Sequence, residues 1–263
     1  MDDFSNLIRF YTEDCCEEER LTPPHGQVEF LTTMRYLDQY LFSGAKILEI
    51  GAGPGRYSHA LARRSFEVEA LELVPKNIQV FRQNTLPGEK VRIRQGNALD
   101  LSIYPDECFD LTLLLGPMYH LYTEEDRRKA LSEAVRVTKT GGILFVAYCI
   151  GDASILQHGF IRGNIRSVIE TGLLNPITFD TIPSPVSIFS LYRKENIDAL
   201  NSGLPVERLH YLATDLLTHL IPETVDAMDP ETFELYLRWH FTVCERPDMV
   251  GLTNHSLDIL RKI

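Results

Sequence analysis

The sequence predicts an α/β fold built on a mostly parallel β-sheet with helices on both faces. Short, near-continuous apolar runs alternate with helical segments through the middle of the chain, a pattern typical of strands buried on both faces. A glycine-rich loop, Gly51–Gly55, directly follows the first of these runs. With 263 residues, the chain is long enough for one such domain carrying an insertion.

The apolar runs define seven expected strands, and helical periodicity defines the segments between them. The strands are expected at Lys46–Ile50, Val68–Leu73, Val91–Gln95, Phe109–Leu115, Ile143–Ile150, Arg208–Ala213 and Ser256–Arg261. The helices that accompany them are expected at Tyr57–Arg64, Lys76–Asn84, Glu124–Val137, Arg193–Asn201 and Pro230–Cys244. We therefore expect residues 45–263 to form the domain that contains the sheet.

Two segments fall outside this alternation. Residues 1–44 are polar and mostly helical, with a break at Pro23-Pro24 and a helix from Gln27 to Leu41, and we expect them to form a cap. Residues 151–190 contain scattered Gly, Pro, Ser and Asn around one expected helix, Ile155–Thr171. We interpret this second segment as an insertion that forms a lid over the carboxyl edge of the sheet.

Composition and charge argue against several classes of protein. No apolar run approaches the roughly 20 residues of a membrane span, and the first residues lack the basic, apolar leader of a secretory signal. The formal net charge of −11 disfavours a nucleic-acid partner, which basic side chains would have to bind. The five cysteines lack the spacing of a disulfide framework or a zinc site. We therefore expect free thiols, no metal and a cytoplasmic location.

The glycine loop predicts a site for a nucleotide-like ligand. Glycines after a strand allow a tight turn and close approach of the backbone to a ligand at the start of the next helix. A dinucleotide site needs G-x-G-x-x-G/A, but counting from Gly51 places Arg56 where a small residue is required. The spacing therefore disfavours a dinucleotide. A plain strand-to-helix turn is the structural alternative.

Polar or small residues follow the next three strands as well. Glu72 ends the second strand and can accept hydrogen bonds from ribose hydroxyls, while Asn97-Ala98 follows the third strand and can flank an adenine. Leu115–Leu121 leaves the fourth strand with a glycine and then a Tyr-His pair. Because parallel strands end at one edge of the sheet, these groups are expected to meet there.

The loop Glu49-Ile-Gly-Ala-Gly-Pro-Gly55 resembles motif I of the class I methyltransferases that use S-adenosylmethionine (SAM). Glu72, Asn97-Ala98 and Phe109–Leu115 resemble that family's next landmarks in order and spacing. The resemblance covers residues 40–150 well and extends to bacterial small-molecule enzymes of the ubiquinone and menaquinone group. It implies a Rossmann-like sheet of seven strands with the last strand antiparallel.

The resemblance also implies SAM as cofactor and S-adenosylhomocysteine as product. Glu49 would organise the loop and the methionine amino group, Glu72 would hold the ribose, and the Leu115 carbonyl would accept from the amino group. The cofactor-binding residues expected on this basis are Tyr11, Glu49, Gly51, Ala52, Gly53, Gly55, Tyr57, Glu72, Leu73, Asn97, Ala98, Leu115 and Gly116.

Candidates for the methyl-acceptor side come from three segments. His120 is a candidate base and Tyr119 a candidate positioning group, although both residues suit a packed wall equally well. The substrate-binding candidates are Arg20, His25, His158 and Arg162. For these four the alternative is an ordinary solvated helix face.

The predicted function is methyl transfer from SAM to a small molecule, with O, N, S and C all open as the accepting atom. An RNA methyltransferase, a catalytically silent SAM-binding module and a dinucleotide-linked oxidoreductase are the alternatives. After the fourth strand there is no Asn/Asp-Pro-Pro-aromatic stretch, and Cys108 lies at the wrong end of that strand for attack on cytosine C5. Neither partners beyond the acceptor nor an oligomeric state is predicted.

Overall fold

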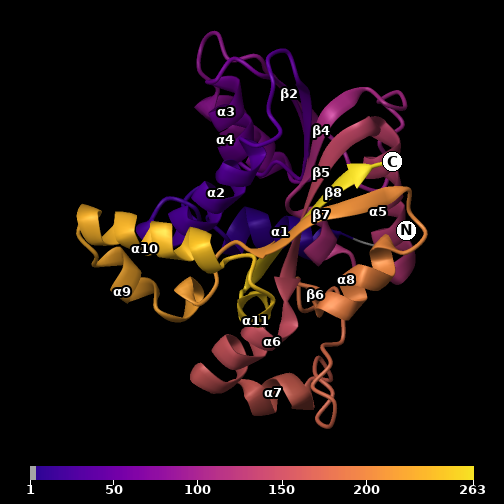
Figure 1. Ribbon diagram of the computed structural model, residues 1–263. Coiled ribbons are helices and arrows are strands. Elements are labelled where there is room, and N and C mark those ends of the chain that lie inside the picture. Colours follow the sequence, from indigo (N-terminus) through magenta and orange to yellow (C-terminus); the bar gives the residue numbers. More distant parts are fainter. Residues whose placement is uncertain (1–3) are drawn as a thin grey trace.

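The computed structural model describes residues 4–263, so the first three residues of the predicted cap lie outside it. A sheet with helices on both faces forms the centre of the molecule, as expected (Figure 1). Its strands are β1 (Lys46–Ile50), β2 (Glu67–Glu72), β3 (Val91–Gln95), β4 (Phe109–Leu114), β5 (Thr138–Ile150), β6 (Leu191–Tyr192), β7 (Val206–Ala213) and β8 (His255–Lys262). They are arranged in the order β3-β2-β1-β4-β5-β8-β7, and β6 pairs with β5.

Strand directions confirm the mostly parallel sheet with an antiparallel last strand. β1 to β5 pair in parallel, whereas β8 is antiparallel to both β5 and β7. The seven predicted strands form the continuous path of the sheet, and β6 is an additional strand that pairs with β5. It has only two residues, which pair with Cys149 and Ile150, so it is too short to leave an apolar run in the sequence.

Helices pack on the two faces of the sheet through separate apolar clusters. The helices that accompany the sheet are α2 (Pro24–Leu37), α3 (Arg56–Ala62), α4 (Pro75–Asn84), α5 (Glu124–Val137) and α8 (Lys194–Asn201). Leu37 of α2 and Leu61 of α3 pack with Ile47 of β1 on one face. Leu131 of α5 packs with Leu48 on the other face. Side chains of β1 therefore alternate between two buried faces, which makes the strand apolar throughout.

The lid and the start of the cap lie beyond the carboxyl ends of the parallel strands, whereas α2 packs on a face of the sheet (Figure 1). The cap begins with α1 (Ser5–Arg9) and a π-helical turn, Phe10–Asp14, and ends with α2. The lid contains α6 (Gly151–Ser154), a second π-helical turn, Ile155–Ile161, and α7 (Ile165–Glu170). The single lid helix Ile155–Thr171 was therefore wrong, because Gly163, at φ +75°, breaks the helix.

Smaller differences affect the ends of elements. Pro24 does not break a helix but occupies the first turn of α2, where its missing N–H costs nothing. β5 begins at Thr138, ahead of the glycines at 141 and 142 that were expected to separate helix from strand. The helices α9 (Pro222–Asp226) and α11 (Pro247–Val250) were not predicted, whereas α10 (Pro230–Val243) was.

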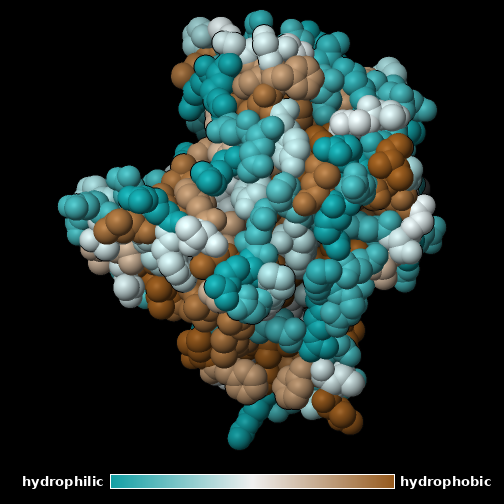
Figure 2. All heavy atoms as spheres, in the orientation of Figure 1, coloured by the Kyte–Doolittle hydropathy of each residue, from teal (hydrophilic) through white to brown (hydrophobic). Residues whose placement is uncertain are grey.

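The surface differs between the sheet domain and the lid. None of the helices in residues 4–263 is both long and apolar enough to cross a membrane. The five cysteines are unpaired, as expected. Half of the exposed large apolar side chains of the described chain belong to the lid, where Figure 2 shows hydrophobic residues gathered. They are Leu156, Phe160, Ile161, Ile177, Phe179, Ile182, Val186 and Phe189.

Candidate functional site

The glycine loop turns sharply between β1 and α3. Gly51 and Gly53 have φ of +76° and +54°, and Gly55 begins α3 with φ +92°. A Cβ atom on Gly51 would lie 2.6 Å from Cδ of Pro117, in the segment that follows β4. Only glycine therefore permits this contact between the two strand-end loops.

Glu72 holds the loop from the end of β2. Its Oε2 accepts from the Gly53 N–H at 2.8 Å, and its Oε1 accepts from the Val74 N–H at 2.8 Å. Burial raises the pKa of the Glu72 carboxyl, while these backbone donors oppose the rise. The carboxylate is thus already fixed, with lone pairs left for a ligand.

Glu49 is a second buried carboxyl of the loop, at the end of β1. It accepts a hydrogen bond from the Ser58 hydroxyl of α3. Burial raises its pKa to about 8, so the carboxyl is mostly protonated at neutral pH until a cationic group approaches it.

A cavity, here named the glycine-loop cavity, lies at the carboxyl ends of β1 to β4. Every predicted cofactor-binding residue except Gly55 lines it. Gly55 has a structural position instead, because it begins α3. Phe4, Leu7, Tyr11 and Arg20 of the cap close the cavity. With the cap in this position its volume is only about 110 Å³, below the 300–1,000 Å³ typical of ligand sites.

A second cavity, the lid cavity, has a volume of about 780 Å³. Its walls come from the lid, the cap, the end of β5 and the start of β8. Tyr11, Glu17, Arg20 and Tyr119 line both cavities and so form a shared wall. The two cavities are therefore adjacent.

Both predicted catalytic residues are buried beside the shared wall. The Tyr119 hydroxyl donates to the Leu115 carbonyl oxygen at 2.8 Å, the same carbonyl that was predicted to bind the cofactor. His120 Nδ1 lies 2.9 Å from the Ile188 carbonyl, so it carries the proton, and Nε2 accepts from the Tyr11 hydroxyl at 2.9 Å. Burial lowers the pKa of His120 to about 4. His120 is therefore uncharged at neutral pH, and its two hydrogen bonds link Tyr11 of the cap to Ile188 of the lid.

The predicted substrate-binding residues divide into two groups. Arg20 lies in the shared wall, and His158 and Arg162 line the lid cavity. His25 lines neither cavity: its Nδ1 pairs with Asp226 of α9 at 2.8 Å. Its position at the first turn of α2 directs it to α9 instead, so His25 is not part of the candidate site.

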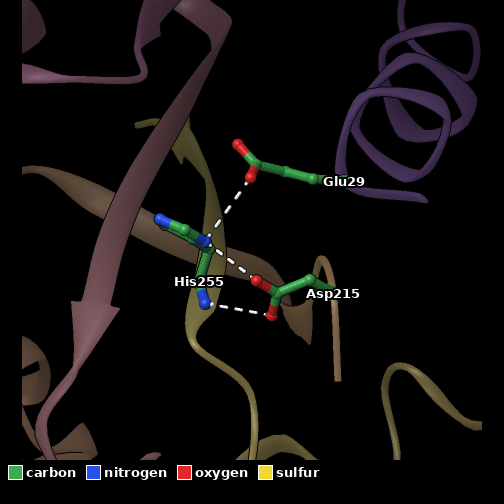
Figure 3. A group of neighbouring side chains, drawn as sticks. All are labelled: Glu29, Asp215 and His255. Carbon is green, nitrogen blue, oxygen red and sulfur yellow. Dashed lines mark hydrogen bonds and ion pairs between the residues drawn. The ribbon is translucent and has the colours of Figure 1, made fainter. Parts of the chain in front are cut away.

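The sequence analysis missed a charged network beside the shared wall. Arg20 binds Glu17 and Glu29, and Glu29 and Asp215 both approach Nδ1 of His255 (Figure 3). The donor atoms of Glu29, Asp215 and His255 lie within 4.8 Å of one another, but the Arg20 guanidinium already occupies the Glu29 carboxylate. We therefore interpret the group as an ion-pair network. Its members come from distant segments, and no sequence spacing links them.

Comparison with known families agrees with this geometry. Residues 48–146, from β1 through most of β5, match the family model described as a methyltransferase domain. This part of the chain is similar to the class I SAM-dependent methyltransferases.

Individual members of the family match over part of their length. A glycine/sarcosine N-methyltransferase from Aphanothece halophytica is 32% identical over 44% of this chain and 45% of its own. A ubiquinone biosynthesis O-methyltransferase from Xylella fastidiosa (strain M23) is 34% identical over 47% of this chain and 52% of its own. The chain thus spans about half the length of these curated relatives.

The fold also matches over its whole length. The structure of a SAM-dependent methyltransferase from Thermotoga maritima superposes with a TM-score of 0.57 over 99% of this chain and all of the other, at 18% identity. At that identity the match concerns the Rossmann-like fold and not the chemistry.

Proposed function

We propose that this methyltransferase transfers the methyl group of SAM to a small molecule bound in the lid cavity. The observation that carries the proposal is the shared wall of Tyr11, Glu17, Arg20 and Tyr119 between the two cavities. Methyl transfer requires donor and acceptor to meet at one point, and this wall is where ligands in the two cavities would meet.

The residues of the glycine-loop cavity fit SAM. Glu72 has free lone pairs for ribose hydroxyls, and Asn97 and Ala98 line the end where an adenine would bind. Glu49 would accept from the methionine ammonium group, with the Leu115 carbonyl beside it. Carboxylates suit a ligand that bears both a sulfonium and an ammonium charge.

The lid cavity favours a small and partly apolar acceptor. Phe10, Leu174 and Phe189 contribute apolar walls, whereas His158, Arg162 and Asn254 contribute polar groups. A nucleic acid would need a basic groove, which the acidic balance of the chain disfavours. The relatives named for N- and O-methylation leave nitrogen and oxygen both open as the accepting atom.

The catalytic contribution of the chain would be alignment and exclusion of water. SAM supplies a methyl group on a positively charged sulfur, which leaves by in-line displacement. The hydrogen bond from Tyr119 to the Leu115 carbonyl holds the Tyr119 ring in the wall. The hydrogen bond between Tyr11 and His120 would hold the Tyr11 ring once the cap has closed over the cofactor. Cap and lid together would keep water from the reacting atoms. Unpaired cysteines suit a reducing compartment such as the cytoplasm.

Calorimetry with SAM, S-adenosylhomocysteine and NAD tests the cofactor. We expect SAM and its demethylated product to bind and NAD not to bind. The variant Gly51→Ala should abolish SAM binding, because its Cβ would meet Pro117. Gly44→Ala is a matched control, since Gly44 also has a positive φ but no atom within 4 Å of a Cβ. Binding of NAD alone would overturn the proposal.

Methyl-labelled SAM with a pooled small-molecule extract tests the acceptor. We expect label in a low-molecular-weight product, and none with Gly51→Ala. Label in RNA would favour the RNA methyltransferase instead. SAM binding without any labelled product would favour the silent SAM-binding module.

A further inference from the structure

We propose that His255, oriented by Asp215 and Glu29, takes the proton that the methyl acceptor loses. This inference rests on the proposed function and names the proton-accepting residue of the same site. His120, the histidine that the sequence singled out, is unsuited to the task. Its two ring nitrogens are occupied by Ile188 and Tyr11, and its pKa is lowered to about 4 by burial.

His255 has the geometry of an oriented base. Its Nδ1 lies 2.9 Å from Oδ2 of Asp215 and 3.4 Å from Oε2 of Glu29 (Figure 3). In the neutral ring Nδ1 keeps the proton that these carboxylates hold, and Nε2 is the nitrogen that accepts. A carboxylate that fixes the tautomer of a histidine in this way is the arrangement of catalytic histidine pairs.

Asp215 is itself held in place by the backbone it faces. Its Oδ1 accepts from the Asn254 N–H at 2.9 Å and from the His255 N–H at 3.1 Å. The Thr253 hydroxyl donates to the same oxygen. Oδ2 is consequently fixed toward the imidazole. Asp215 is a positioning residue, because it acts through His255 and lines neither cavity.

The free side of the His255 ring faces the lid cavity. In Figure 3 the second ring nitrogen points away from both carboxylates, and His255 lines the lid cavity together with Cys149, its cross-strand partner on β5. The ring centroid lies 6.4 Å from that of Tyr119, in the shared wall. An acceptor at the wall would thus lie within reach of His255.

The proton transfer balances without a further reactant. The acceptor X–H forms an X–C bond to the methyl carbon, and the C–S bond breaks with its electron pair remaining on sulfur. The X–H electron pair stays on X, and the proton moves to Nε2 of His255. Asp215 and Glu29 stabilise the resulting imidazolium. The acceptor class is therefore a small molecule with a weakly acidic X–H, such as an amine, phenol or thiol.

The charges around His255 support a strong base. Burial opposes the charged form, but Glu29 of α2, Cys149 of β5 and Asp215 together raise the pKa of His255 well above its usual value. The other groups facing the network are Arg20, which binds Glu29, and His219, which interacts with Asp215 and His255. A base of raised pKa suits an acceptor that holds its proton tightly, and it predicts a rate that rises with pH.

The variant Asp215→Asn tests the orientation of His255 through the pH–rate profile. Loss of the Asp215 charge lowers the pKa of His255, so the pH at which the rate rises should move to lower values. The probe is methyl-labelled SAM with the small-molecule extract used for the acceptor screen. Ring NMR of His255 in the SAM-bound protein should show the same acid shift and needs no acceptor.

The variant His255→Gln tests the proton transfer itself. We expect kcat to fall about 10²- to 10⁴-fold with an unchanged Kd for SAM. His25→Gln, a histidine that lines neither cavity, is the matched control and should retain kcat. The inference is overturned if His255→Gln has a normal kcat, or if Asp215→Asn does not shift the pH–rate profile. Either result leaves the proposed function standing. Failure of the wild type to bind SAM would instead overturn the proposed function.

Discussion

The Glu72 carboxylate serves two partners, the loop it holds and the ribose it would bind. We expect Glu72→Ala to weaken SAM binding by about 1–3 kcal/mol, because ligand hydroxyls and the Gly53 N–H lose their acceptor. Calorimetry measures the change. Glu67→Ala, an exposed carboxylate at the other end of β2, is the control and should not alter the affinity. An unchanged affinity for Glu72→Ala would remove this residue from the site.

The Glu49 carboxyl predicts a pH dependence of cofactor binding. Its pKa of about 8 in the empty site lies above the ordinary value, so at pH 7 the group is protonated and must release its proton to accept from an ammonium group. Affinity for SAM should therefore rise between pH 7 and about 8, with proton release visible in calorimetry across buffers of different ionisation enthalpy. Glu49→Gln should bind more weakly and lose this release. Equal proton release by both proteins would contradict the assignment.

At the scale of elements, we expect the cap to move when cofactor binds. The glycine-loop cavity of about 110 Å³ is too small for a nucleoside with an amino-acid tail, and cap residues such as Leu7 and Tyr11 close it. We expect hydrogen exchange of the cap to change on addition of SAM, with protection in α1 and the adjoining turn. The exposed helix α7 of the lid is the internal control. Identical exchange of the cap with and without SAM would mean that the cofactor enters without cap movement.

The elements of the sheet were predictable because each has a local cause. β1 and β3 begin and end at the predicted residues. β1 is an apolar run between turn residues, whereas in the edge strand β3 the apolar residues Val91 and Ile93 alternate with polar ones. Helix α5 also has its predicted bounds, with Thr123 accepting from the Asp126 N–H at its start. The lid was harder, because Gly163 interrupts a pattern that otherwise continues as helix.

The candidate site was predictable only where neighbours in sequence are neighbours in space. The strand-end groups Gly51, Glu72 and Asn97 follow from the parallel sheet, which brings consecutive carboxyl ends to one edge. Glu29 comes from α2, Asp215 from the segment after β7 and His255 from the start of β8. Hydrophobic periodicity does not predict contacts between segments so far apart in the sequence. The sequence therefore predicted the residues of the glycine-loop cavity but not His255, the proposed proton acceptor.

At the scale of the whole molecule, His240 joins the cap to α10. Its Nε2 donates to Thr32 of α2 at 2.9 Å, and Nδ1 is buried without a partner. Burial lowers its pKa to about 4, so the unfolded chain binds more protons between pH 6.5 and 4. The stability that neutral His240 provides is present above pH 6.5 and is lost as pH falls toward 4.

The variant His240→Gln isolates this contribution. The difference in unfolding free energy between wild type and variant should shrink by about 3 kcal/mol from pH 7 to pH 4, the cost of protonating a histidine of this pKa. Urea unfolding at several pH values measures the difference. Other groups, such as Glu49, also change the unfolding free energy with pH, in the opposite direction. Both proteins contain these groups, so their contributions cancel in the difference. A constant difference would show that His240 charges freely in the folded protein.

The wall shared by the two cavities couples the binding of two ligands. Because Tyr11, Glu17, Arg20 and Tyr119 line both spaces, a ligand that moves these side chains in one cavity also changes the wall of the other. Linkage between two sites is reciprocal, so each ligand should change the Kd of the other by the same factor.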